Sequence, residues 1–253
     1  MQFNLYDGAV VLDFDEEAHK YTYNGELVPS VTTVTDIVDK SAALIPWALN
    51  QAEKYIRGNF PIDSYVSQTL LDSLLEGMKQ SHRKIKYKAA DIGTQAHEWI
   101  ESHIKAQMEF KESPALPFDP QVSNAVLQFL EFEKQNHVVY LASERKVFSL
   151  INKFAGTLDI LAHVNGVHTL LDIKTSNQYR KEYAMQSAAY VLAVNEEDNS
   201  DIKDRIILML SKDEAKFEPV SLPSSELLTD TGAFLSAFDL YRWGKAYRKP
   251  KKK

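Results

Sequence analysis

Alternating apolar and polar residues predict a small β-ribbon near the start of the chain. The alternation covers residues 9–28, and Asn24-Gly25 separates two of its strands. Asn-Gly suits the positive-φ positions of a two-residue hairpin turn, so we expect antiparallel strands on either side of it. The hydroxyl group of Ser30 or Thr32 can then cap a short helix that follows the ribbon.

A helical repeat replaces this alternation in the next part of the chain. From residue 43 to about residue 107, apolar residues recur every three or four positions, which is the spacing of one helix face. We expect interruptions near residues 58–61 and near Gln80, and a loop is then marked by Pro114, Pro117 and Pro120. The ribbon and these helices are assigned together to residues 1–115, as a helical N-terminal module with a small β-ribbon.

The second half of the chain mixes helices with strands. We expect helices at residues 121–136, 182–194 and 224–247, and strands at residues 138–144, 156–164, 167–173 and 205–210. Asn165-Gly166 joins the second strand to the third as a hairpin. Strands with helices on both faces predict an α/β core near residues 120–220. We assign residues 116–253 to this part and expect both parts to form one compact unit.

Composition excludes several classes of protein. The 253 residues are 44% hydrophobic and 25% charged, as in globular proteins, and no stretch reaches the ~20 apolar residues that cross a bilayer. The first residues do not resemble a secretion signal and are too acidic for a mitochondrial transit peptide, so we expect an intracellular protein without a membrane partner. The chain has no cysteine, which excludes disulfides, thiolate zinc sites and iron–sulfur clusters.

Basic residues are gathered in two segments of a chain whose net charge is −6. The net charge argues mildly against a protein that coats nucleic acid. However, residues 242–253 contain seven Lys or Arg and no acid, and residues 82–88 contain four more Lys or Arg. Either segment can attract phosphate groups, although a solvated tail explains the C-terminal segment equally well.

The second hairpin carries two acids and a lysine in otherwise apolar strands. Asp159 precedes the turn, and Asp172 and Lys174 follow it, two residues apart and therefore on one face of their strand. With Asn165-Gly166 as the loop, antiparallel pairing places Asp159 directly opposite Asp172, with Cβ atoms ~5 Å apart. Two desolvated carboxylates at this distance repel each other unless a cation lies between them. We therefore predict a divalent metal ion, Mg²⁺ or Mn²⁺, at this position.

Structural explanations compete with this interpretation. Lys174 alone can neutralise the two carboxylates, which would make the group an ion cluster without a metal. His163 and His168 also face each other across the hairpin, and for this pair we expect cross-strand packing rather than chemistry.

The hairpin motif resembles that of the PD-(D/E)XK nuclease superfamily, in its RecB-like branch. The matching residues are Gly156-Thr157-Leu158-Asp159 and Asp172-Ile173-Lys174-Thr175, and Leu158 stands where the name-giving proline would be. Gln186 and Tyr190 are similar to the QxxxY element of that branch, and the segment from Gly93 to Glu98 is similar to its helical histidine motif. The resemblance covers most of residues 90–195, and the N-terminal run also resembles phage-encoded exonucleases and the mitochondrial genome-maintenance exonuclease.

This resemblance implies a fold and a role for each site residue. The expected fold is α/β with a restriction-endonuclease-like core, a central mixed sheet flanked by helices. The implied metal ligands are His97, Asp159, Asp172, the carbonyl group of Ile173, and Glu144. Lys174 would orient the attacking water or stabilise charge on phosphorus, while Gln186 and Tyr190 would fix Lys174 or hold the strand. The candidate DNA contacts are Ser30, Thr32, Thr33, Lys40, Trp47, Lys88 and Thr175.

The implied activity is metal-dependent hydrolysis of DNA phosphodiester bonds by an exonuclease, with single-stranded ends favoured. The setting would be DNA replication, recombination, repair or phage DNA processing in a bacterial or phage-infected cytoplasm, with a replication or recombination protein as a candidate partner. A double-strand-end recombination exonuclease is the first alternative. A catalytically silent DNA-binding protein on the same fold is an alternative from another class.

Overall fold

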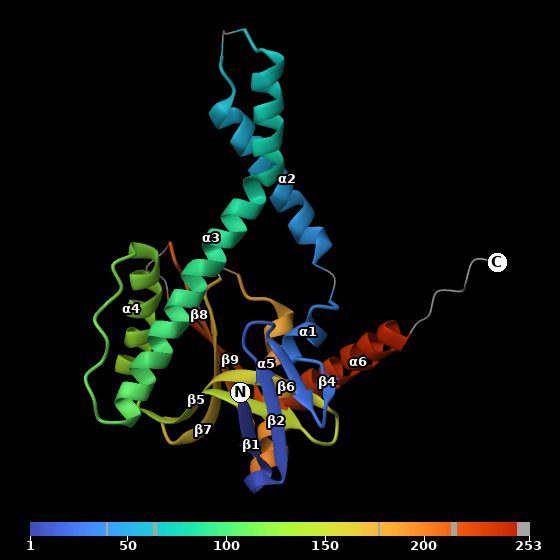
Figure 1. Cartoon of the computed structure of the whole chain (residues 1–253). Helices are drawn as coiled ribbons and strands as arrows, with labels where there is room; N and C mark the ends of the chain where they lie inside the picture. The colour runs from blue at the N-terminus through green and yellow to red at the C-terminus, as the bar shows by residue number, and fades with distance from the viewer. Residues whose placement is uncertain (39, 63–64, 177, 214–216, 247–253) are drawn as a thin grey trace, which may run out of the picture. The chain divides into compact units, whose positions relative to one another are not determined.

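The computed structural model describes residues 1–38, 40–62, 65–176, 178–213 and 217–246 (Figure 1). The chain divides into two compact units, one made of residues 1–38 with 96–253 and the other of residues 39–95. None of the described helices is both long enough and apolar enough to span a bilayer.

The ribbon at the N-terminus is a four-stranded antiparallel sheet. Its strands follow chain order as β1 (Gln2–Leu5), β2 (Val10–Asp15), β3 (Lys20–Tyr23) and β4 (Glu26–Val28), with a short 3-10 turn, η1 (Tyr6–Gly8), after β1. The predicted Asn-Gly hairpin is confirmed, because Asn24 and Gly25 have φ angles of 51° and 79° between β3 and β4. The strand β1 lies before residues 9–28, to which the alternation was assigned, so it was not predicted.

The ribbon packs on the second half of the chain. Leu12, Phe14 and Tyr21 form one buried cluster with Phe148 and Ala155. The compact units therefore divide at residues 38/39 and 95/96, and not at the boundary expected at residues 115/116. Sequence periodicity could not show this, because it reports the face that a strand buries but not the partner on which that face packs.

A short helix, α1 (Val31–Thr35), connects the ribbon to the rest of the chain. Ser30 is its N-cap residue, and the side-chain oxygen of Ser30 accepts a hydrogen bond from the backbone N–H of Thr33. The predicted capped helix is thus confirmed, with Ser30 and not Thr32 as the cap. Ser30 also forms a bridge to Ala155, which fixes α1 against the second half of the chain.

Residues 39–95 contain α2 (Ser41–Asn59) and most of α3 (Gln68–Met108), whose last turns belong to the other unit. The interruption near residues 58–61 is confirmed, but the one expected near Gln80 is wrong, because α3 continues through it. Its polar side chains there bond within the helix: Gln80 donates to Glu76 at 2.6 Å, and the hydroxyl of Ser81 donates to the carbonyl of Met78 at 2.8 Å. A polar cluster without proline or a capping break does not end a helix.

The main sheet is mixed and flanked by helices, so the α/β prediction is confirmed (Figure 1). Its order is β5 (Val138–Ser149), β6 (Phe154–Val164), β7 (Val167–Lys174), β8 (Asp204–Leu210) and β9 (Phe217–Leu222), and only the β7–β8 pair is parallel. The remaining elements are α4 (Pro120–Gln135), α5 (Lys181–Asp198), the 3-10 turn η2 (Ser224–Glu226) and α6 (Leu227–Ala246). The helix α5 is the crossover between β7 and β8 that a parallel pair requires. Only β9 was not predicted in this half.

Candidate functional site

The β6–β7 hairpin has the register that the sequence predicts. Asn165 and Gly166 form the turn with φ angles of 52° and 84°, and pairing runs from Val164–Val167 to Ile160–Leu171. One step further, this register places Asp159 opposite Asp172. Regular pairing ends at that step, where Oδ2 of Asp159 accepts a hydrogen bond from the backbone N–H of Ile173 at 2.6 Å. The first acid is therefore tied to the strand that carries the second.

A third acid, Glu144 on β5, lies on the other side of Asp159 from Asp172. Ser143 pairs with Ile160, and Arg145 pairs with Leu158, so Glu144 stands opposite Asp159 across the β5–β6 ladder. Glu144 also has a φ of 51°, which is left-handed backbone in a residue other than glycine. Such a conformation costs ~1–3 kcal/mol and is concentrated at functional sites. Three adjacent strands thus each contribute one carboxylate at the same level of the sheet.

A histidine from α3 joins two of these acids. One ligand atom each from His97, Glu144 and Asp159 lies within 4.8 Å of the others, and all three residues are half-buried. Each belongs to the unit formed by residues 1–38 and 96–253. Two carboxylates and an imidazole are ligands suited to Mg²⁺ or Mn²⁺, so these residues fit a divalent ion.

The electrostatics of this triad also fit a cation. Burial, followed by the charges of Asp159 and Glu101, raises the pKa of Glu144 to about 7. The charges of Lys146 and Lys105 lower the pKa of Glu144 only in part. The ammonium group of Lys146 lies 5.1 Å from the centroid of the Phe14 ring and donates to the backbone carbonyl of Glu144 at 3.5 Å. The two carboxylates are therefore held near each other without a cation between them among the described residues, and this repulsion favours a metal ion.

Asp172 and Lys174 form an ion pair beside the triad. Asp172 is fully buried, and its Oδ2 lies 2.5 Å from Nζ of Lys174. Its Oδ1 accepts no hydrogen bond from any residue that the structure describes. A buried carboxylate oxygen without a partner has an unused site for a cation or a water molecule. Asp172 is not one of the three clustered ligands, so its role as a metal ligand and that of the Ile173 carbonyl remain predictions.

The ion pair keeps Lys174 charged. Burial alone lowers the pKa of Lys174, but the carboxylates of Asp172 and Asp159 outweigh this effect and raise it above its ordinary value. Burial raises the pKa of Asp172, against the opposing effect of Lys174. Lys174 therefore neutralises Asp172, as the metal-free interpretation expects, but Asp159 turns to Ile173 and to the triad.

Gln186 and Tyr190 lie together on α5, as their spacing predicts. The side-chain amide of Gln186 donates to the Tyr190 hydroxyl at 3.1 Å. Tyr190 is buried, and burial, then the charges of Asp172 and Asp159, raises its pKa well above the ordinary value. Its ring also covers Gly156, where an added Cβ would be 2.6 Å from Cε1 of Tyr190. The pair thus lies beside the acids, and its contact with Lys174 remains a prediction.

The candidate DNA contacts are distributed over both units. Ser30, Thr32 and Thr33 form one hydroxyl cluster, in which Oγ of Ser30 lies 3.0 Å from Oγ1 of Thr32 and 2.8 Å from Oγ1 of Thr33. Thr175 is half-buried directly after β7. Lys40, Trp47 and Lys88 belong to residues 39–95, where Trp47 packs edge-on against His82 with ring centroids 6.4 Å apart. A DNA-binding role remains a prediction for all of them.

Sequence reasoning missed Tyr21 at this site. Its hydroxyl group lies 2.7 Å from Oγ1 of Thr157, two residues before Asp159 on β6. Burial raises the pKa of Tyr21, and the charge of Glu144 adds to this effect. In the sequence, Tyr21 is one apolar position of the ribbon, and no signal connects it with a strand more than a hundred residues away.

Comparisons with known proteins leave the family of this chain open. No family model matches the sequence, and no curated protein matches it. The chain is similar to a solved structure described as the crystal structure of SSO0001, with 11% sequence identity over 77% of this chain and 85% of that chain and a TM-score of 0.29. A similarity of this extent carries no functional argument, which therefore rests on the residues of the site.

Proposed function

We propose that this chain is a divalent-metal-dependent DNA exonuclease that hydrolyses phosphodiester bonds, with single-stranded ends as its preferred substrate. The observation that carries the proposal is the row of Glu144, Asp159 and Asp172 on three adjacent strands, with His97 on one side and Lys174 on the other. Metal ligands of this type beside a fixed cation are what hydrolysis of a phosphate diester needs. The choice of DNA and of strand ends rests on the motif resemblance.

Each residue of the row has a separate task in this proposal. His97, Glu144 and Asp159 would hold the ion, with Oδ1 of Asp172 as a further oxygen ligand. A bound divalent ion would supply a Lewis acid that polarises a phosphate oxygen and lowers the pKa of water. Asp172 holds the ammonium group of Lys174 in place, and this cation would orient a water molecule or stabilise negative charge on the phosphate.

Cleavage of end-labelled DNA tests the proposal. Wild-type protein should shorten labelled single strands from an end with Mg²⁺ or Mn²⁺ and should be inactive in EDTA. Asp159→Asn should reduce the rate by at least ~100-fold, because it removes a ligand charge. The matched control is Asp201→Asn, since the Asp201 side chain is 81% exposed and pairs only with Lys203 among the described residues. Cleavage that survives both EDTA and Asp159→Asn would contradict the metal mechanism.

One observation favours a catalytically silent DNA-binding protein as the second candidate. Lys174, the cation that hydrolysis would use, is already held by Asp172. A silent protein would bind oligonucleotides in EDTA and with Mg²⁺ to the same extent, and it would leave both single and double strands intact. Faster degradation of duplex ends than of single strands would instead favour the double-strand-end alternative.

A further inference from the structure

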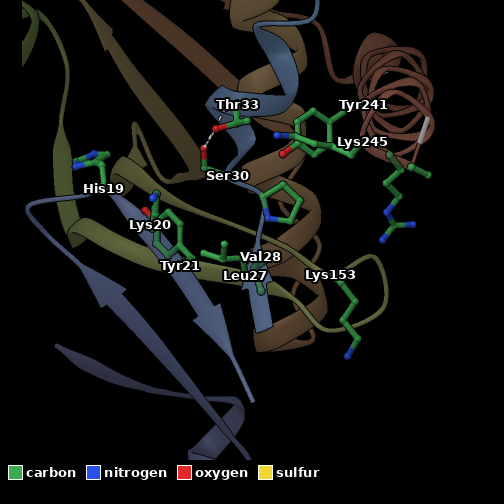
Figure 2. A pocket seen from close by; sticks show the side chains of 13 residues that line it. His19, Lys20, Tyr21, Leu27, Val28, Ser30, Thr33, Lys153, Tyr241 and Lys245 are labelled. Carbon is green, nitrogen blue, oxygen red and sulfur yellow. Dashed lines mark hydrogen bonds between the residues drawn. The ribbon is translucent and has the colours of Figure 1, made fainter. Parts of the chain in front are cut away.

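A hollow lies in the same unit as the acidic row formed by Glu144, Asp159 and Asp172. It has a volume of about 790 Å³ and is formed by β3, β4, the start of α1, the loop before β6 and the last turns of α6 (Figure 2). This volume lies in the ~300–1,000 Å³ range of ligand pockets. None of these segments carries a residue of the acidic row, so the hollow is a separate feature of the fold.

The lining of this hollow is basic. Lys20, Lys153, Arg242 and Lys245 line it, and no acidic residue does. None of these four forms an ion pair with a carboxylate in the part of the chain that the structure describes. Arg242 instead donates to the carbonyl of Asn152 at 2.6 Å. Nζ of Lys153 lies 5.0 Å from the centroid of the Tyr23 ring. A lining with four basic side chains and no acid favours a polyanionic ligand.

The hollow also offers hydroxyl and aromatic groups. Ser30 and Thr33 contribute hydroxyls, which donate to phosphate oxygens, and they lie close to Tyr241 and Lys245 in Figure 2. Tyr241 contributes an aromatic ring. Nζ of Lys245 lies over this ring, 5.6 Å from its centroid. Cations combined with an aromatic platform are the features with which proteins bind single strands independently of sequence.

Tyr21 connects this hollow to the acidic row. It lines the hollow, while its hydroxyl group lies 2.7 Å from Oγ1 of Thr157, two residues before Asp159. The effect of Glu144 on the pKa of Tyr21 places that carboxylate nearby as well. The hollow and the acidic row thus share one buried side chain, Tyr21, as a neighbour.

We propose that this hollow binds the sugar–phosphate backbone of a single DNA strand. The nucleotides bound in the hollow would lie next to the nucleotides that reach the acidic row. The choice of DNA rests on the proposed function. The four cations come from β3, the loop before β6 and α6, which suits several successive phosphates better than the single phosphate group of a nucleotide.

Binding measured without cleavage tests this inference. A fluorescently labelled twenty-nucleotide oligothymidylate is titrated in EDTA at several salt concentrations, with wild type, Lys20→Gln/Lys245→Gln and a control, Lys134→Gln/Lys203→Gln. The control lysines are exposed, at 80% and 53%, and do not line the hollow. The slope of log affinity against log salt should become shallower by about 1.4 in the first variant, for two lost phosphate contacts, and stay unchanged in the control.

Each outcome decides between the two proposals. Equal slopes of log affinity against log salt for all three proteins would overturn the binding site. An equal loss of strand binding in the two double variants would overturn it as well. Binding of free thymidine monophosphate without binding of the strand would also overturn it, in favour of a nucleotide pocket. Strand binding that depends on Lys20 and Lys245 without metal-dependent cleavage would support the binding site and refute only the nuclease.

Discussion

The carboxylate of Asp159 accepts a hydrogen bond from the backbone N–H of Ile173, at 2.6 Å, where the β6–β7 ladder stops. A side chain thus takes the place of a strand carbonyl at the level of the site. The bond fixes one oxygen of Asp159, and the same carboxylate also belongs to the cluster with His97 and Glu144. The Asp159 side chain therefore has two roles, the hydrogen bond to Ile173 and a place in the ligand cluster. Two substitutions of Asp159 can distinguish these roles.

Asp159→Asn and Asp159→Ala should differ in stability. The asparagine carbonyl can still accept the Ile173 N–H, so the free energy of unfolding should change little. Alanine leaves that buried N–H unpaired, which should cost ~1–3 kcal/mol. Mn²⁺ should raise the melting temperature of wild type, and both variants should lose this rise, because each removes a ligand charge. Urea unfolding and thermal melts with and without Mn²⁺ measure the two effects, and equal destabilisation by both variants would contradict this role of the hydrogen bond.

Lys174→Met should destabilise the protein by ~3–5 kcal/mol, because it leaves the fully buried Asp172 without its cation. The sequence alone suggests a milder result, loss of turnover with the fold retained, because it does not show how deeply Asp172 is buried. Urea unfolding of Lys174→Met, Asp172→Asn and the double variant measures the coupling. The double variant should be more stable than Lys174→Met, and additive losses would show that the two side chains do not act as a pair.

The sequence predicted the hairpin and its register well because both follow from short-range rules. Asn165-Gly166 fixes the turn, and the two-residue period of a strand then places Asp159 opposite Asp172. The partner of each charge could not be predicted in this way. Whether Lys174 lies beside Asp172 or between both acids depends on side-chain torsions and on the burial that α5 provides, which no strand period encodes.

The sequence missed two strands and the basic hollow. The strand β1 lies before residues 9–28, to which the alternation was assigned, and β9 contains Pro219, a residue depleted in strands. The basic hollow combines Lys20 and Lys245, which are more than two hundred residues apart in the chain. Tertiary contacts of this separation leave no local pattern, and of the basic C-terminal segment that the sequence singles out, Arg242 and Lys245 line this hollow.

Gly156→Ala should destabilise the protein by ~1–3 kcal/mol, because the new methyl group would lie 2.6 Å from the buried Tyr190 ring. The matched control is Gly232→Ala in α6, where an added Cβ meets no atom within 4 Å and where alanine should stabilise the helix by up to ~1 kcal/mol. Chemical unfolding of both variants provides the comparison. If Gly156→Ala is as stable as wild type, the close packing of Tyr190 on β6 is not a constraint on the site.

The pair formed by His163 and His168 should make stability depend on pH. Their rings pack edge-to-face across the hairpin with centroids 5.1 Å apart, as expected for cross-strand packing. Burial, then the charge of His163, lowers the pKa of His168 below its ordinary value of 6.5. The unfolded chain therefore takes up a proton near pH 6.5 that the folded protein does not, so this contribution to stability is present above that pH and is lost as the pH falls.

His168→Gln should flatten this dependence, because glutamine has no group that titrates in the same range. Urea unfolding of wild type and His168→Gln at pH 7.5, 6.5 and 5.5 gives the slope, which for one histidine is at most about 1.4 kcal/mol per pH unit. His137→Gln is the matched control, because the His137 side chain is exposed to solvent. A wild-type slope that His168→Gln leaves unchanged would assign the pH dependence to other groups, and the His163–His168 contact would then have no electrostatic cost.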